Sequence, residues 1–142
     1  MLQQYQQTLN MNTFGQGLVD ITHPLQQVLD DSAFMMGQMT VFIRHTSASL
    51  TIQENADPTV QSDLVTAFDR LAPEGRHLYD HTLEGPDDMP AHIKSALTDV
   101  SLTIPFAQGV LGLGRWQGVY IFEHRRQPHR RSVVCHLIGS TA

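Results

Sequence analysis

Apolar residues recur every three or four positions in two segments, which is the spacing of one face of an α-helix. The first segment, THPLQQVLDDS at residues 22–32, opens with Thr22, a residue type that can cap a helix. The second covers residues 56–75, with Asp57 as its capping residue and Pro73 near its end. The apolar stripe of this second segment consists of Val60, Leu64, Phe68 and Leu71. We therefore predict an amphipathic helix in each segment.

A third, shorter helix is predicted over about residues 90–99, where Pro90 suits the first turn. Its inward stripe is expected to consist of Ile93, Leu97 and Val100. His92 lies at the edge of that stripe, since neighbouring residues are about 100° apart around a helix. The polar segment before it, residues 75–89, is long for a loop of a compact domain, and such loops are often functional.

The other apolar runs are short and typical of β-strands. Residues 34–47 hold apolar side chains on both faces, which predicts a strand in the centre of a sheet. Further strands are expected at residues 2–9, 17–21 and 49–54, and in four short runs after residue 100. The pattern predicts an α+β fold in a single domain, residues 1–142, with two or three helices packed on a mainly antiparallel sheet or sandwich.

Composition narrows the class of protein. The chain has 142 residues, 41% of them apolar, and no apolar run long enough to span a bilayer. The first ten residues lack the basic start and apolar stretch of a signal peptide, and the single cysteine, Cys135, excludes an internal disulfide. We expect a cytoplasmic protein that does not bind membranes. Nucleic acid is not an expected partner, because the net charge is −5 and no basic helix is present.

Positive charge is concentrated in the last third of the chain. After residue 100 the only acidic residue is Glu123. Five arginines occur there: Arg115, Arg125, Arg126, Arg130 and Arg131. Arginine is favoured where phosphate or carboxylate is held by two parallel hydrogen bonds. These residues predict either an anion-binding surface or a solvated turn with structural ion pairs.

Three histidines stand where predicted elements meet. His45 ends a strand, His81 lies in the long loop, and His92 starts the third helix. Neutral imidazoles are zinc ligands, and three of them leave one coordination position open. The sequence therefore raises the hypothesis of a divalent metal site, against the alternative that these histidines are structural or solvated.

Carboxylates flank the same segment. Asp87 and Asp88 precede the third helix, where they can either serve its free amides or orient metal ligands. A serine nucleophile is not indicated, because no Gly-x-Ser-x-Gly elbow is present and Ser47 follows His45 too closely.

Four stretches resemble the YjbQ family: HTSASLTIQENADP, HTLEGPDDMPAHIKSAL, IPFAQGVLGLGRWQGVYIFEHR and RRSVVCHLIG. They occur in the family's order from about residue 39 to the end of the chain. The resemblance implies an α+β domain that assembles as a homotrimer. It places the family's histidines on His45, His81 and His92, which we expect to bind a divalent metal such as zinc. Arg115 departs from the family pattern, in which a small threonine is usual.

The resemblance also implies a metal-assisted transferase with thiamine-phosphate synthase activity, which joins a pyrimidine methyl diphosphate to a thiazole phosphate and releases pyrophosphate. In that hypothesis Glu84 or Asp88 orients a metal ligand or stabilises positive charge. The phosphate groups of the small phosphorylated substrate would contact Thr46, Ser47, Arg125 and Arg131. The alternatives are a metal-dependent hydrolase or phosphatase of a small phosphorylated compound, and a non-catalytic trimeric protein that binds a small anion.

Overall fold

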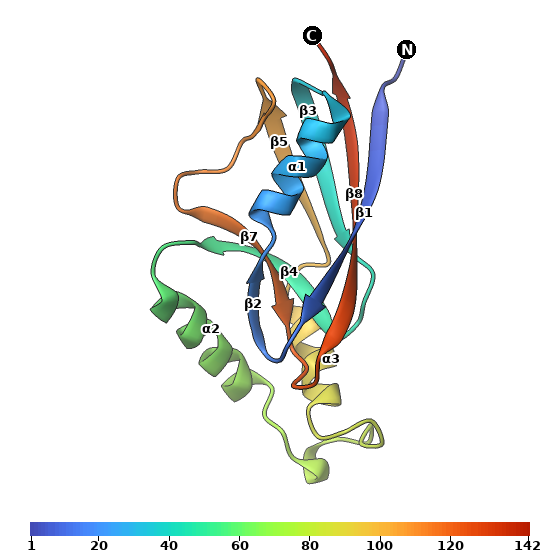
Figure 1. Cartoon of the computed structure of the whole chain (residues 1–142). Helices are drawn as coiled ribbons and strands as arrows, with labels where there is room; N and C mark the ends of the chain where they lie inside the picture. Colours follow the sequence, from blue (N-terminus) through green and yellow to red (C-terminus); the bar gives the residue numbers. More distant parts are fainter.

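The computed structural model describes residues 1–142 and contains three α-helices, one short 3-10 helix and eight strands (Figure 1). In chain order they are β1 (Gln4–Thr13), β2 (Gly17–Asp20), α1 (Thr22–Ser32), β3 (Met36–Ile43), β4 (Ala48–Glu54), α2 (Pro58–Leu71), the 3-10 helix η1 (Arg76–Leu78), α3 (Asp88–Leu97), β5 (Ser101–Ala107), β6 (Val110–Leu111), β7 (Gln117–Glu123) and β8 (His129–Ser140). The predicted α+β class is confirmed.

The strands form two antiparallel sheets. The larger sheet has the order β1-β8-β3-β5-β6, and the smaller has the order β2-β7-β4. The strand predicted to be central, now β3, is the middle strand of the larger sheet, and the long β8 pairs with β1 on one edge and β3 on the other. Both sheets and α1 contribute to one hydrophobic core, to which α1 supplies Leu25, Val28 and Leu29.

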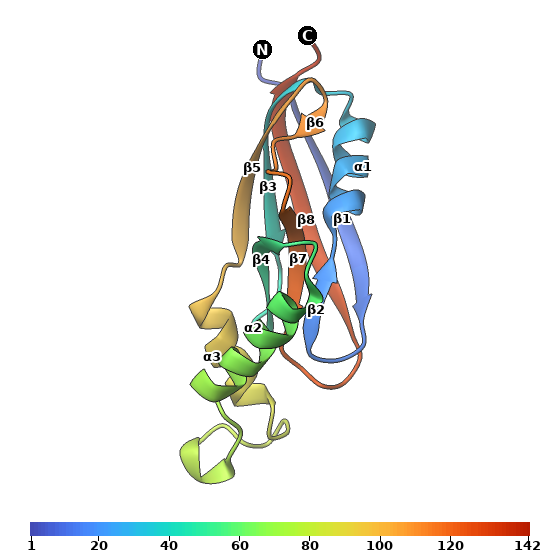
Figure 2. The same cartoon turned by 90° about the vertical axis from the view of Figure 1, so that its left-hand side faces the viewer.

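The helices lie at different ends of the molecule. Figures 1 and 2 show α1 near the end that holds both chain termini, while α2 and α3 lie at the other end. None of the three helices has the length and hydropathy that crossing a lipid bilayer requires.

The sequence predicted the N-terminal cap of α2 correctly and that of α1 wrongly. Asp57 caps α2 as predicted, because its side chain accepts a hydrogen bond of 2.9 Å from the main-chain N–H of Thr59. Thr22 does not cap α1. Its own N–H donates to Asp20 Oδ1 at 2.9 Å, and its hydroxyl accepts from the N–H of Val119 on β7. The Thr22 side chain therefore fixes α1 to the smaller sheet.

The predicted inward stripe of α3 is wrong. Leu97 is 58% exposed and Val100 is 40% exposed. The buried residues of α3 are Asp88, Pro90, Ala91, Lys94 and Ser95. A charged residue can face inward here because Lys94 Nζ lies 2.6 Å from Asp69 Oδ1 of α2, which neutralises it. The structure thus buries a mixed face of α3, on which Pro90 and Ala91 accompany polar residues, and leaves Leu97 outside.

Candidate metal centre

His81, Asp88 and His92 bring their ligand atoms within 4.8 Å of one another. Asp88 and His92 are one turn apart at the start of α3, so that both side chains leave the same face of the helix. His81 comes from the loop before α3, and its Nε2 lies 2.7 Å from Asp88 Oδ2. His92 Nε2 approaches the same oxygen at 3.1 Å. We refer to these three residues as the His-Asp-His cluster.

The contact made by His92 Nδ1 shows where one proton of the ring lies. His92 Nδ1 lies 3.0 Å from the main-chain oxygen of Thr46. Since a carbonyl oxygen only accepts, Nδ1 carries a proton, and a neutral His92 then turns an Nε2 lone pair toward the Asp88 carboxylate. A contact of 3.1 Å between Nε2 and the carboxylate therefore needs a proton or a metal ion between the two atoms. A carbonyl acceptor at the far nitrogen is also the usual support of a metal-binding histidine.

Asp88 is held by the turn between β7 and β8. Arg125 Nη1 donates to Asp88 Oδ1 at 2.7 Å, which leaves Oδ2 for the two histidines. The carboxylate is 2% exposed. Burial by itself raises the pKa of Asp88, but the hydrogen bond from His81 and the charge of Arg125 outweigh it and hold the pKa below its usual value. Asp88 therefore presents an ionised oxygen to the cluster.

Asp87 supports the same turn. Its Oδ2 accepts from Arg125 Nε at 3.1 Å and from the main-chain N–H of Arg126 at 2.9 Å. Burial raises the pKa of this carboxyl, and the hydrogen bonds from Arg126 and Arg125 lower it by more. The helix-capping role considered for these aspartates is not observed, because the Asp87 side chain makes no cap hydrogen bond to α3. Asp87 instead holds the turn, and Asp88 faces the histidines.

His45 lies beside the cluster and is not brought into it. Its Nε2 accepts a hydrogen bond of 2.8 Å from the N–H of Ser132 on β8, and its Nδ1 faces Arg131 Nη1 at 3.4 Å. Burial, followed by the charge of Arg131, lowers the pKa of His45. His45, Thr46 and His92 line a hollow of about 240 Å³. The structure therefore groups two of the three predicted histidines, and Asp88 stands where His45 was expected.

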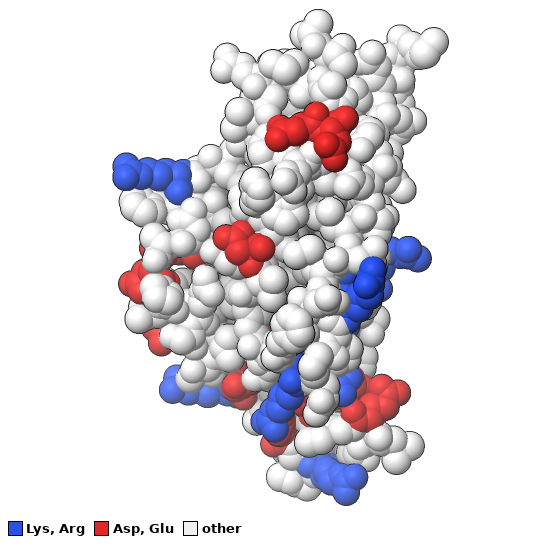
Figure 3. All heavy atoms as spheres, in the orientation of Figure 1, with Lys and Arg blue, Asp and Glu red and all other residues white.

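The two arginines expected to hold phosphate are engaged within the protein. Buried Arg131 donates from Nε and Nη2 to the fully buried Glu123, and Nη2 also reaches the Ser47 hydroxyl at 3.1 Å. Arg125 donates from all three nitrogens, to Asp87, to Asp88 and to the main-chain oxygen of Glu84. Glu84 itself is exposed, as is Thr46. Figure 3 shows that positive and negative side chains alternate at this end of the molecule.

The sequence did not reveal a buried polar group next to this site. His124 is 1% exposed, and its Nε2 lies 2.8 Å from the Ser49 hydroxyl. Burial, followed by the charge of Lys94, lowers the pKa of His124 to about 3. The burial of His124 was indicated only by its position directly after the apolar β7. A strand buried on both faces shows no alternation of apolar and polar residues from which burial could be predicted. Cys135 is buried, and burial raises the pKa of its thiol to about 12.

Arg115, the residue that departs from the family pattern, lies in the segment between β6 and β7. Its guanidinium stacks 4.9 Å from the ring centroid of Trp116. Both side chains are exposed, and neither belongs to the His-Asp-His cluster.

Comparisons with known proteins cover nearly the whole chain. The family described as "UPF0047 protein YjbQ-like" matches residues 7–140. A UPF0047 protein of Synechocystis sp. is 52% identical over 136 residues, which make up 96% of this chain and 92% of that protein. A crystal structure of a conserved hypothetical protein from Thermus thermophilus has a TM-score of 0.83 at 39% identity, covering 92% of this chain and 98% of that one.

A more distant structure shares the fold alone. A YbjQ-like protein of unknown function from Sulfolobus solfataricus has a TM-score of 0.89 at 22% identity, covering 99% of this chain and 100% of that one.

These matches confirm the resemblance to YjbQ and correct the activity inferred from it. The expectation of thiamine-phosphate synthase activity is wrong. The matches are to UPF0047, a family of unknown function that is distinct from the thiamine-phosphate synthases. The fold and the motifs that support the resemblance are not affected by this correction. The chain belongs to the YjbQ-like UPF0047 family.

Proposed function

We propose that this protein binds a divalent metal ion, with zinc as the first candidate, and that the ion receives a phosphate group of a small phosphorylated ligand. The ligands are the Nε2 atoms of His81 and His92 and the Oδ2 atom of Asp88. The observation that carries the proposal is the approach of His92 Nε2 to Asp88 Oδ2 at 3.1 Å while His92 Nδ1 is bound to a carbonyl oxygen. A metal ion would accept both lone pairs in place of the proton that otherwise joins these two atoms.

The donor set suits the ion. Two imidazole nitrogens and one carboxylate oxygen are ligands that zinc accepts, and three protein ligands leave a position open. A divalent ion held in this way supplies Lewis-acid chemistry at that position. Thr46 orients His92 through its carbonyl oxygen, and Arg125 orients Asp88 through Oδ1. Such supporting contacts normally accompany a metal site.

The charges around the cluster determine what binding of a phosphorylated ligand would require. Arg125 is neutralised by Asp87 and Asp88, and Arg131 is neutralised by Glu123. The protein therefore brings no free cation to the cluster from either arginine. A bound divalent ion supplies the missing positive charge, so anion binding is expected to depend on the metal.

The test measures metal content and phosphate binding in the same preparations. We expect about one zinc ion per chain after loading, lost in His81→Ala and in Asp88→Asn, with His77→Ala as the matched control because His77 lies in the same segment outside the cluster. Calorimetry with inorganic phosphate should show binding to the zinc-loaded protein and none after chelation. Full metal content in His81→Ala contradicts the ligand set, and equal phosphate affinity after chelation contradicts the role of the ion.

We also propose that the chain assembles as a homotrimer through the outer face of the larger sheet. No helix covers this face in Figures 1 and 2. β1, β3 and β5 contain no charged residue, and β8 contains none after Arg131. Light scattering tests the assembly: Thr40→Lys, at the middle of the face, should reduce the mass to that of the 15.9 kDa chain. Ser62→Lys on exposed α2 is the control, and a wild-type protein of monomer mass overturns the proposal.

A further inference from the structure

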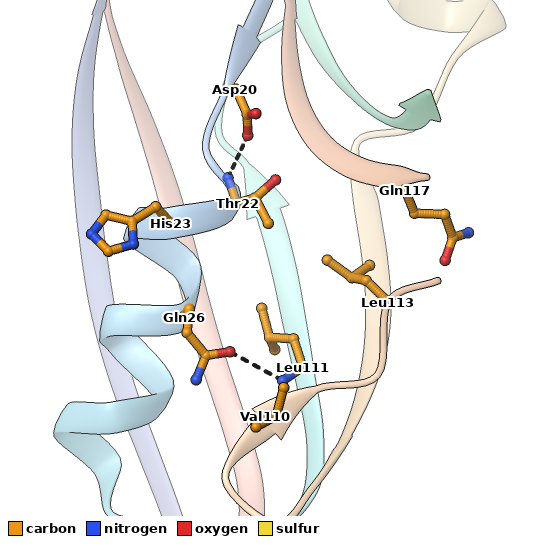
Figure 4. Close-up of a pocket in the computed structure, with 8 residues that line it drawn as sticks. All are labelled: Asp20, Thr22, His23, Gln26, Val110, Leu111, Leu113 and Gln117. Atoms are coloured by element: carbon orange, nitrogen blue, oxygen red, sulfur yellow. Dashed lines mark hydrogen bonds between the residues drawn. The ribbon is translucent and has the colours of Figure 1, made fainter. Parts of the chain in front are cut away.

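A groove runs between the start of α1 and the segment that joins β6 to β7 (Figure 4). Its volume is about 460 Å³, which falls in the range of small-molecule sites. Eight residues line it: Asp20, Thr22, His23, Gln26, Val110, Leu111, Leu113 and Gln117. None of them belongs to the His-Asp-His cluster, and α1 and α3 lie at different ends of the molecule.

Hydrogen bonds hold both walls of the groove in place. At one end Gln26 donates from Nε2 to the oxygen of Gly109 at 2.8 Å and accepts from the N–H of Leu111 at 3.1 Å (Figure 4 draws the second bond). At the other end the Thr22 hydroxyl accepts from the N–H of Val119. The groove is therefore formed before any ligand enters, and binding does not have to order its walls.

The opposite wall is a closed turn. Gln117 Oε1 accepts from the N–H of Gly114 at 2.7 Å, and the N–H of Gln117 donates back to the Gly114 oxygen at 3.0 Å. Asn55, at the end of β4, donates from Nδ2 to the oxygens of Arg115 and Gln117. These bonds fix Gln117 at the rim and leave its Nε2 without a partner in the protein.

The chemistry of the lining is asymmetric. Val110, Leu111 and Leu113 supply the apolar part of the lining. At the rim Asp20 uses Oδ1 to accept from Thr22, and its second oxygen makes no hydrogen bond within the protein. Asp20 is the only charged residue of the lining, and Asp30 and Asp31 add negative charge on α1, which carries no lysine or arginine. The only charged side chains that Figure 3 shows over α1 are acidic.

We propose that this groove binds a small amphipathic amine. Its ammonium group would pair with the free oxygen of Asp20, and its apolar body would lie on Leu111 and Leu113. An anionic compound is disfavoured by the charge of the rim, and a purely apolar one would make no use of the exposed Asp20 carboxylate. The nearest basic side chain in sequence, Arg115, stacks on Trp116 and is not part of the lining.

Three probes of similar size test the proposal by two-dimensional NMR on the full chain. They are phenethylamine, 2-phenylethanol and 3-phenylpropionate, which differ in the charge of the polar end. Saturable shifts confined to residues 20–26 and 110–117 are expected with phenethylamine, with weaker binding of the alcohol and none of the carboxylate. Equal binding of all three, or shifts spread over the surface, overturns the proposal.

Two variants locate the ligand. Asp20→Asn retains an oxygen that can accept from the Thr22 N–H but removes the charge, and it should weaken amine binding about fivefold, the value of one exposed ion pair. Val110→Trp fills the groove from an exposed position and should abolish binding. Asp63→Asn, on exposed α2, is the charge-matched control and should bind like the wild type. Unchanged amine affinity in both groove variants, or absence of any amine binding because a second copy covers the groove, overturns the assignment.

Discussion

Arg125 and Asp88 are joined by a hydrogen bond of 2.7 Å between Nη1 and Oδ1, and this bond leaves the other carboxylate oxygen facing two imidazoles. The contact links the β7–β8 turn to the first turn of α3. Arg125 therefore acts on the proposed metal centre through Asp88, without being a ligand itself. Its side chain sets which oxygen of Asp88 is available and in which direction that oxygen points.

Replacement of Arg125 by alanine should weaken metal binding by about ten- to a hundred-fold without changing the number of ions bound, as is usual for residues that orient ligands. Zinc affinity measured by competition with a chelator of known affinity checks this. Arg126→Ala is the matched control, because Arg126 pairs with Glu74 through an exposed side chain. If Arg125→Ala binds zinc like the wild type while circular dichroism shows an intact fold, Asp88 does not depend on this contact.

Glu123 and Arg131 form a buried ion pair, and removing its charge on one side should destabilise the fold strongly. Glu123→Gln is expected to lower the free energy of unfolding by about 3–5 kcal/mol, since it leaves Arg131 buried without a counter-ion. Urea denaturation of the wild type and the variant measures the difference. A change below about 1 kcal/mol would show that the pair is not desolvated in solution.

His124 should make the protein less stable as the pH falls. Its folded-state pKa of about 3 lies below the ordinary value of 6.5, so the unfolded chain takes up the proton first. The stability is unaffected above about pH 6.5 and declines below it, by at most about 1.4 kcal/mol per pH unit from this group. Denaturation of the wild type and His124→Gln from about pH 5 to about pH 7, on both sides of the ordinary histidine pKa, isolates the effect, because the other histidines contribute to both proteins. Parallel pH profiles would contradict a neutral, buried His124.

Asp57 should stabilise α2 through its side chain, independently of the proposed metal centre. Asp57→Ala is expected to lower the midpoint of thermal unfolding, and Asp57→Asn to lower it much less, because asparagine keeps the oxygen that accepts from Thr59. Thermal unfolding of both variants measures the two shifts. Equal losses in the two variants would assign the effect to charge instead of to the hydrogen bond.

The sequence predicted those elements whose own residues decide their conformation. The bounds of α1, the Asp57 cap of α2 and the central place of β3 all follow from local spacing and residue type. The third helix was predicted, but its inward face was not: Leu97 is exposed and Lys94 is buried. Lys94 faces inward because of Asp69 on another helix, and a pairing between distant segments leaves no periodic signal in either one.

The residues of the candidate site could also be predicted only where local sequence decides their position. The sequence placed His81 in the long loop and His92 at the start of the third predicted helix, with Asp88 between them. The exclusion of His45 from the cluster depends on the N–H of Ser132, which occupies its Nε2. The engagement of Arg131 depends on Glu123, eight positions away across a turn. Neither contact can be predicted without the pairing of β8 with its neighbours.

The three residues of the His-Asp-His cluster all come from one short stretch of chain, between His81 and His92, whereas the groups that orient them belong to Thr46 and Arg125. This separation has an evolutionary consequence. Substitutions around Thr46 or in the β7–β8 turn can adjust the affinity of the centre by small steps, while the donor atoms stay unchanged. A lineage could thus retune the site to a new metal supply or a new ligand and still keep every donor residue.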